Sequence, residues 1–108
     1  MCTKAETIEQ IRQTAQKTMP PNGKLILFGS QARGDAHEGS DWDLLVIIDK
    51  ERLLPEDYDA ITYPLTYLGW TIGEEINPIM YTQQEWNKSR ITPFYENVLR
   101  DGITLIAA

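Results

Sequence analysis

Two aspartates separated by one residue stand at the head of an apolar run. Asp41 and Asp43 lie within Ser40-Asp41-Trp42-Asp43-Leu44, and the apolar residues continue to Ile48. Along a strand, residues two apart share a face and lie roughly 6.6 Å apart by rise, so the two carboxylates can converge on one hard cation such as Mg²⁺. The alternative interpretation is a pair of solvated acids at the open end of a strand. The spacing alone leaves both interpretations open.

A glycine and a serine follow a shorter apolar run upstream, Leu25-Ile26-Leu27-Phe28. A strand that leads into Gly29-Ser30 presents backbone N–H groups and a hydroxyl to an anion, particularly where a helix begins. Ser30 by itself is also typical of a helix N-cap that binds no ligand. Arg33 suits either a phosphate or an aspartate such as Asp41, because a guanidinium fork matches both acceptors. The turn and the aspartates together indicate a site for phosphate and Mg²⁺.

The two segments together resemble the signature of the minimal nucleotidyltransferases of the DNA-polymerase-beta-like superfamily. That signature is Gly-Ser-x-Ala-Arg-Gly, a short spacer, and Ser-Asp-x-Asp-Leu. All its fixed positions are present, as Gly29, Ser30, Ala32, Arg33, Gly34, Ser40, Asp41, Asp43 and Leu44. The likeness extends more weakly from Lys24 to Ile106. It implies a palm fold in which Gly29 and Ser30 contact the phosphates of a nucleotide triphosphate.

The chain departs from that family at one position. Active members generally carry a third acid on the next core strand, where the best match here is Asn77. An amide oxygen can ligate Mg²⁺ but has no charge and is not a base at neutral pH. Glu75, two residues earlier on the predicted strand face, is a substitute for the acid or simply a solvated strand entrance. The predicted site therefore comprises catalytic Asp41, Asp43 and Glu75, metal-binding Asp41 and Asp43, and nucleotide-binding Gly29, Ser30 and Arg33.

Two functions from different classes follow from the resemblance. The first is a Mg²⁺-dependent nucleotidyltransferase that moves a nucleoside monophosphate, expected to be AMP from ATP, to an acceptor held by a partner protein. A partner is expected because no second domain remains in the chain to recognise an acceptor. The second is a catalytically weak or inactive member that acts by binding, as the antitoxin-like partner of a small helical ribonuclease. The missing third acid is the reason to consider the second.

Length and composition limit the class of protein. With 108 residues and 42% apolar content, the chain is expected to form one domain, residues 1–108, around a single core. A net charge of −6 argues against nucleic acid as the main partner, because that interface requires clustered Lys and Arg. Neither a signal peptide nor a membrane-length apolar run is evident. Cys2 is the single cysteine, so no intrachain disulfide can form, which fits the cytoplasm.

The elements that must position these residues alternate between helix and strand. The capping pattern at Thr3 and the apolar spacing after it predict a helix over 4–18. The predicted strands are 24–28, 41–48 and about 74–82, the last an edge strand or a bulge because of Pro78. The other predicted helices begin at Ser30, at Pro55 (ending near Gly69), at Thr82 and at Thr92-Pro93, before an extended tail over 103–106. This order is typical of an α/β fold with a small mixed sheet flanked by helices.

Several conspicuous side chains are assigned no chemistry. His37, the only histidine, lies among charged residues in a predicted loop and is expected to be solvated. Trp42 alternates with the two aspartates and is therefore predicted to pack on the opposite face of the strand. The remaining aromatic group, Trp86, Phe94 and Tyr95, is expected to pack between helices.

Overall fold

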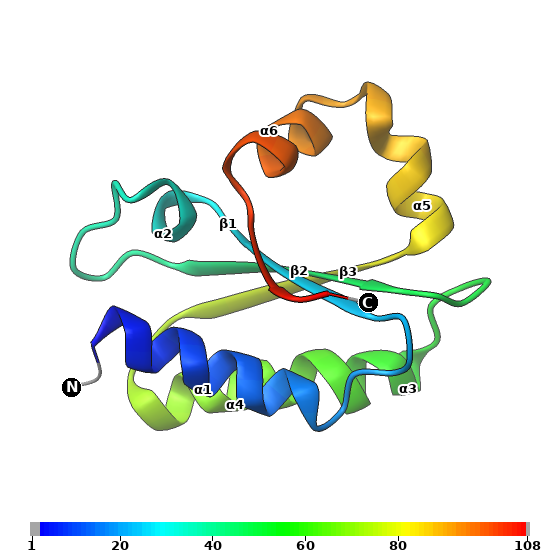
Figure 1. Cartoon of the computed structure of the whole chain (residues 1–108). Helices are drawn as coiled ribbons and strands as arrows, with labels where there is room; N and C mark the ends of the chain where they lie inside the picture. Colours follow the sequence, from blue (N-terminus) through cyan, green and yellow to red (C-terminus); the bar gives the residue numbers. More distant parts are fainter. Residues whose placement is uncertain (1–2, 108) are drawn as a thin grey trace.

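The computed structural model describes residues 3–107 and contains a four-stranded sheet in the order β3-β2-β1-β4. The strands are β1 (Lys24–Phe28), β2 (Trp42–Ile48), β3 (Ile76–Thr82) and β4 (Ile103–Ile106). β1 runs antiparallel to both β2 and β4, whereas β2 and β3 are parallel. Helices cover both faces of the sheet (Figure 1). The predicted α/β fold with a small mixed sheet is confirmed.

One face of the sheet packs on a helical layer, which lies below it in Figure 1. This layer consists of α1 (Lys4–Gln16), α3 (Pro55–Asp57), the π-helical turn η1 (Tyr58–Thr62) and α4 (Tyr63–Ile72). α1 begins at the predicted capping box, in which the side chains of Thr3 and Glu6 accept from each other's backbone N–H groups. It ends two residues earlier than predicted. Alternate strand residues, including Leu27, Leu44 and Val46, are buried against this layer and form the larger core.

The connection from β2 to β3 is a helical crossover, as a parallel strand pair requires. The predicted helix end near Gly69 is wrong. α4 continues to Ile72 and stops at Gly73, whose φ of +75° is the left-handed conformation that favours glycine. Gly69 lies inside α4, at the point where the helix approaches the chain just before β3. A Cβ on Gly69 would lie 2.6 Å from the carbonyl oxygen of Glu74. Gly69 therefore serves packing and does not end the helix.

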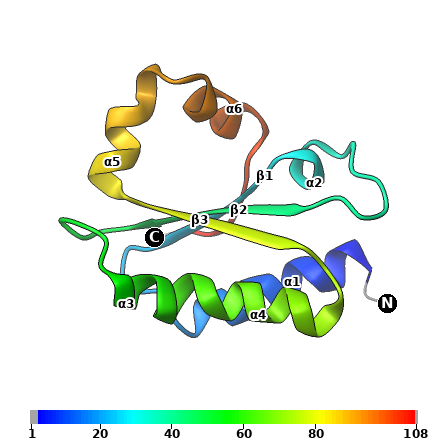
Figure 2. The same ribbon diagram turned by 180° about the vertical axis from the view of Figure 1, so that it is seen from behind.

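The opposite face of the sheet carries α5 (Gln83–Lys88), the 3₁₀ turn η2 (Ser89–Ile91) and α6 (Pro93–Asp101). Figure 2 shows these helices above the sheet and α4 below it, seen from behind. The predicted helix starts are confirmed, because Thr82 caps α5 and Thr92 caps α6. A second core fills this side, and the predicted packing of Trp86, Phe94 and Tyr95 within it is confirmed.

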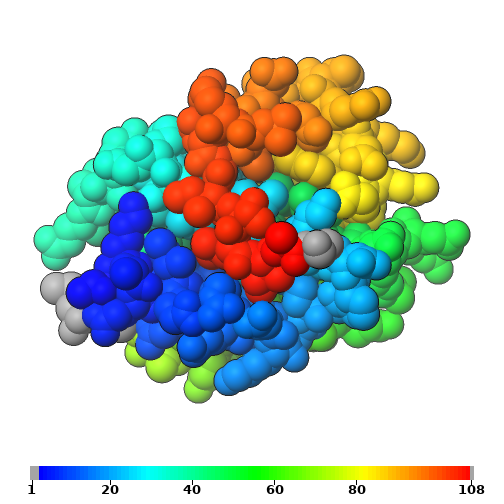
Figure 3. Space-filling model, in the orientation of Figure 1, coloured from blue at the N-terminus to red at the C-terminus, as the bar shows by residue number. Residues whose placement is uncertain are grey.

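The two edge strands of the sheet are β3 and β4. β3 forms one edge, which accounts for Pro78 within it, since a proline has no N–H for a second neighbour. The tail predicted to be extended is β4, which pairs with β1 and forms the other edge. In Figure 3 it fills the surface between α1 and α6. Among the helices of residues 3–107, none is long and apolar enough to cross a bilayer.

The alternation along β2 decides which side chains reach the site described below. Trp42 and Leu44 face the α1–α4 layer, and Trp42 is only 2% exposed, which confirms its predicted packing. Asp43 has the opposite parity and shares its face with Leu45, which packs in the core under α5 and α6. Asp41 lies immediately before β2, because the strand begins one residue later than predicted.

Candidate active site

The turn after β1 depends on glycine. Gly29 has a φ of +78°, and its carbonyl oxygen accepts hydrogen bonds at 3.0 Å from the backbone N–H groups of Ala32 and Arg33. These bonds close the short helix α2 (Ser30–Arg33), which ends at Gly34 with a φ of +85°. The first N–H groups of a helix have no partner inside it. The Ser30 amide and hydroxyl are therefore donors for an anion at this point.

Asp43 lies directly beside this turn. It pairs across the sheet with Phe28, the last residue of β1, and a Cβ on Gly29 would overlap the Oδ2 atom of Asp43. Burial raises the pKa of the Asp43 carboxyl, and the negative charge of Asp41 raises it further. A hydrogen bond with Asn77 and the positive charge of Arg33 lower this pKa and so offset part of the rise. The two aspartates are thus a like-charged pair that their surroundings neutralise only in part.

On β3, the residue that bonds Asp43 is Asn77. The parallel register places the two residues opposite each other, and the amide donates a hydrogen bond to the carboxylate. Glu75 lies one residue before β3, because this strand also begins later than predicted. Its carbonyl oxygen accepts a 2.8 Å hydrogen bond from the backbone N–H of Trp42, and the residue is exposed on the wall of a neighbouring hollow. The side chain that bonds Asp43 from β3 is therefore an amide and not a third carboxylate.

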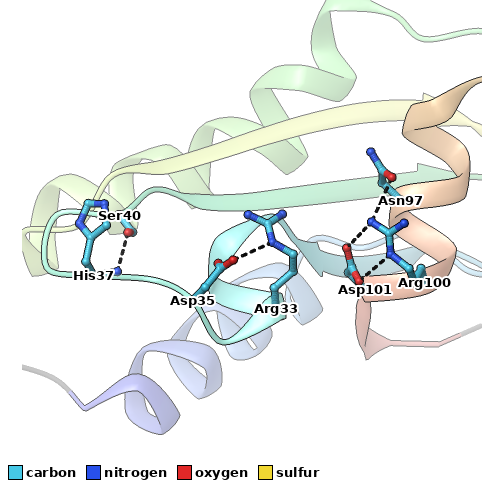
Figure 4. A network of polar contacts seen from close by, with 7 residues as sticks. All are labelled: Arg33, Asp35, His37, Ser40, Asn97, Arg100 and Asp101. Carbon is cyan, nitrogen blue, oxygen red and sulfur yellow. Dashed lines mark hydrogen bonds and ion pairs between the residues drawn. The ribbon is translucent and has the colours of Figure 1, made fainter.

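A cavity of about 440 Å³ opens over these elements. Its walls are Gly29, Ser30, Arg33, His37, Gly39, Ser40, Asp41 and Asp43. All the predicted site residues except Glu75 are therefore brought together in one cavity. The loop from α2 to β2 supplies the rim, where the His37 backbone N–H donates to Ser40 Oγ at 2.8 Å (Figure 4). The sequence does not predict His37 and Gly39 as wall residues, and their place between the two motif halves is the only signal for them.

Arg33 bonds Asp35 and not Asp41. The ion pair joins Nε to Oδ2 at 3.1 Å, and both side chains are largely exposed. Figure 4 shows Arg33 between this carboxylate and α6, where Arg100 pairs with Asp101 at 3.0 Å. The hydrogen bonds from Arg100 are the main cause of the lowered pKa of Asp101, and the charge of Arg33 lowers this pKa further. An exposed ion pair contributes at most about 1 kcal/mol, so a phosphate can compete with Asp35 for the guanidinium.

The oxygen donors of this cavity fit a hard cation. Within residues 3–107, no three His, Cys, Asp or Glu side chains group into an all-protein metal cage. Mg²⁺ is usually bound by only one or two carboxylates, with water and substrate phosphates completing its octahedron. Asp41 and Asp43 provide such an incomplete set beside Ser30, and Asn77 lies next to Asp43 on β3. A cation there would offset the repulsion between the two carboxylates.

The fold and the site define a protein of the nucleotidyltransferase class. A family model described as nucleotidyltransferase domain matches residues 8–98, and the chain belongs to this family. One relative is a protein of Methanocaldococcus jannaschii whose name carries a provisional assignment as a protein adenylyltransferase. It is 39% identical over 82 residues, which cover 76% of this chain and 76% of the relative.

Solved structures share the fold. The crystal structure of a toxin–antitoxin with AMP-PNP matches with a TM-score of 0.66 at 21% identity, covering 94% of this chain and 73% of the other. A mutant of the toxin–antitoxin MntA-HpeT, with two Asp-to-Glu changes, matches with the same TM-score and coverage at 19% identity. The family and the fold that the motif predicts are therefore confirmed.

Proposed function

We propose that the chain is a Mg²⁺-dependent nucleotidyltransferase that transfers AMP from ATP to an acceptor held by, or part of, a partner protein. The observation that carries this proposal is the incompletely neutralised pair Asp41 and Asp43 in one cavity with the Gly29–Ser30 turn. The name of the 39% identical relative supports a protein acceptor, and the neighbour with AMP-PNP supports an adenine nucleotide.

The chemistry of such a transfer requires positioning and charge neutralisation from the protein rather than covalent work. An acceptor oxygen bonds to the α-phosphorus of ATP, the bond from that phosphorus to the bridging oxygen breaks, and pyrophosphate leaves. Ser30 and the first amides of α2 bind phosphate oxygens, and Arg33 neutralises another. Asp41 and Asp43 would hold Mg²⁺, which stabilises negative charge on the phosphate oxygens when bound.

The proton of an attacking hydroxyl must go to another group or to water. Asn77 cannot take it, because an amide is not a base at neutral pH. The remaining acceptors near the cavity are the His37 ring on its rim and the carboxylates, including Glu75 at the neighbouring hollow. We therefore keep Asp41, Asp43 and Glu75 as the proposed catalytic residues, with Glu75 acting only if the acceptor or the loop brings it closer.

The proposal extends to the organisation and location of the chain. Residues 1–108 act in it as one nucleotidyltransferase domain whose partners are ATP and a protein. The net charge of −6 supports a protein rather than nucleic acid as the main macromolecular partner. A single cysteine and the use of ATP support the cytoplasm as the location.

One observation favours a second function, namely the neutral Asn77 bonded to Asp43. A site that lacks the third acid suits a protein that binds nucleotide and partner with little or no transfer. In this alternative the chain is the antitoxin-like partner of a small helical ribonuclease. The description of the solved structures of the same fold as toxin–antitoxins supports this alternative.

Labelled ATP separates the two functions. The purified chain, together with the proteins that co-purify with it, is incubated with ATP labelled on the α-phosphate, with Mg²⁺ or with a chelator. The transferase proposal expects label on a protein only with Mg²⁺ and only when Asp43 is intact. Binding of ATP and of a partner without any transfer of label would reject the transferase and support the binding protein.

A further inference from the structure

The outer face of α4 carries three large aromatic side chains in the open. Tyr63, Tyr67 and Trp70 are four and three residues apart, so they share one side of the helix. Their exposed fractions are 54%, 57% and 68%, and each ring contacts the other two at centroid distances of 6.3 to 6.5 Å. We call these residues the aromatic stripe. Figure 2 shows α4 in front, with no other element over its outer side.

The net negative charge of the chain comes from the segment that contains this stripe. Residues 53–87 contain six of the sixteen acidic residues and no Lys, Arg or His. The rest of the chain holds ten acids and ten Lys or Arg, so the whole net charge of −6 belongs to 53–87. Two of the six acids are bonded, Asp57 to Lys50 and Glu85 to the N-terminus of α5. The other four flank the two ends of the stripe and are Glu56, Asp59, Glu74 and Glu75.

The stripe leads toward the candidate active site. Trp70 lines a hollow of about 350 Å³ together with Glu74 and Glu75. This hollow shares Gly39 and Ser40 with the cavity that contains Asp41 and Asp43. A chain that lies along the stripe and passes Trp70 therefore arrives beside the aspartate pair.

We propose that the aromatic stripe is the docking surface for a partner protein segment rich in Lys and Arg. Cations bind over the faces of Trp and Tyr rings, and these residues dominate protein interfaces energetically. The exposed rings present roughly 400 Å², comparable to the largest functional patches of monomeric proteins. The inference rests on the proposed function in one respect, that the docked partner is the acceptor.

The charges favour such a partner over a second copy of this chain. Pairing two stripes would bring acidic rims against each other, and like charges across an interface are unfavourable. The exposed area of the stripe is also only about half of what each subunit usually contributes to a stable interface between two folded proteins, so it is small for a dimer of this chain. A cationic segment neutralises the rim and covers the rings at the same time.

The test uses the indole N–H signals of the full chain in ¹⁵N-labelled protein. Trp70 is exposed, whereas Trp42 and Trp86 are 2% and 5% exposed and serve as internal controls. The probe is a synthetic peptide of Arg and Leu, and the matched control replaces each Arg with Glu. We expect the Arg peptide to shift the Trp70 signal, less so at high salt, and to leave Trp42 and Trp86 unchanged. No shift, an equal shift with the Glu peptide, or a Trp70 shift that follows protein concentration with dimer formation would overturn the proposal.

Variants locate the binding surface. Tyr63→Ser and Tyr67→Ser should each weaken binding of the Arg peptide about tenfold, since truncated aromatic anchors have effects of this size. Ile91→Ser is the matched control, because Ile91 is 94% exposed on η2. Equal weakening in the control, or none in the two Tyr variants, would overturn the assignment to the stripe.

The charge of the rim is tested separately. Asp59→Lys and Glu74→Lys should abolish the response to the Arg peptide, whereas Glu51→Lys, outside 53–87, should retain it. Asp43→Asn should also bind the peptide like the wild type, so a failure of AMP transfer and a failure of docking are distinguishable. Loss of peptide binding in Asp43→Asn, or retention in both rim variants, would overturn the docking surface.

Discussion

Gly29 and Asp43 approach each other so closely across the β1–β2 pair that a Cβ on the glycine would overlap a carboxylate oxygen of the aspartate. Gly29 also has a φ of +78°. The glycine thus meets two separate requirements: its backbone turns the chain into α2, and its missing side chain leaves the space that Asp43 occupies. Ala or Val at this position would disturb both.

Two variants separate the effect of the Gly29–Asp43 contact on stability from the effect of the positive φ. Gly34 has a similar φ of +85°, but a Cβ on Gly34 would meet no other atom within 4 Å. Gly34→Ala should therefore lower the free energy of unfolding by about 1 to 2 kcal/mol through its backbone alone. Gly29→Ala should cost at least about 1 kcal/mol more, because it also overpacks the site, and it alone should strongly weaken ATP binding. Urea unfolding and ATP titration check this, and equal effects of the two variants would show that the contact with Asp43 is unimportant.

Removal of one charge from the aspartate pair should abolish nucleotide binding without harming the fold. Asp43→Asn relieves repulsion from Asp41 and the cost of burying a charge, so the free energy of unfolding should change by less than about 0.5 kcal/mol or rise. Mg²⁺-dependent ATP binding, measured by calorimetry, should be lost. Asp49→Asn, an exposed acid just beyond the other end of β2, is the control. Unchanged ATP affinity in Asp43→Asn would contradict the proposed metal site.

A third acid at position 77 should increase transfer. Asn77→Asp adds a charge opposite Asp43, which should tighten Mg²⁺ and supply a proton acceptor. Transfer of α-phosphate label should rise in this variant, and thermal stability without Mg²⁺ should fall because three acids then repel one another.

Glu75→Gln tests the other candidate for the third acid. If Glu75 moves in with the acceptor, this change reduces transfer and Asn77→Asp brings little gain. Since Glu75 is exposed, Glu75→Gln should leave stability unchanged in either case. Equal inactivity of wild type and both variants, with partner binding retained, would mean that the chain acts as a binding protein.

The start of the helical crossover should respond to acid. The Asp57 carboxylate accepts hydrogen bonds from Lys50 Nζ and, at 2.8 Å, from the backbone N–H of Leu54, and these bonds lower its pKa. A carboxyl with a lowered folded-state pKa stabilises the fold above its unfolded pKa, near 3.9, and loses this effect as the pH falls further. Asp57→Asn should therefore cost about 1 kcal/mol at pH 7 and progressively less below about pH 4.

The control for this acid response is the exposed Asp59, two residues further along. Asp59→Asn should change the free energy of unfolding by less than about 0.5 kcal/mol at either pH. Chemical unfolding of both variants at several pH values is the measurement. A constant difference between wild type and Asp57→Asn across the acid range would show that its ionised form is not what stabilises the helix start.

Much of the site is predictable because its two motif halves lie on neighbouring antiparallel strands. The chain between Gly29 and Asp43 is short. The alternation along the strand already predicts that the Asp43 side chain lies on the other face of the sheet from Trp42. The choice of Asp35 over Asp41 as the partner of Arg33 follows the path of an irregular loop, for which a sequence carries no periodic signal. The sequence misplaces Glu75 for a related reason, since strand ends are set by hydrogen bonds such as that of Trp42 and not by side-chain pattern.

The sequence does not predict the aromatic stripe, although its spacing is visible there. Tyr63, Tyr67 and Trp70 repeat at helical intervals, but so do the buried Ile61 and Leu65 on the other side of the same helical segment. Pattern alone does not reveal which of two apolar sides the sheet covers. The close approach of Gly69 to the chain before β3 makes that choice, and it is a tertiary contact.

The position of Asn77 on an edge strand has an evolutionary consequence. Only β2 pairs with β3, and the Asn77 side chain is half-buried, so an exchange of acid and amide there alters charge without repacking a core. If position 77 controls turnover as proposed, one codon there separates a catalyst from a binder, a change that a third ligand in a central, buried strand would make more costly to the fold.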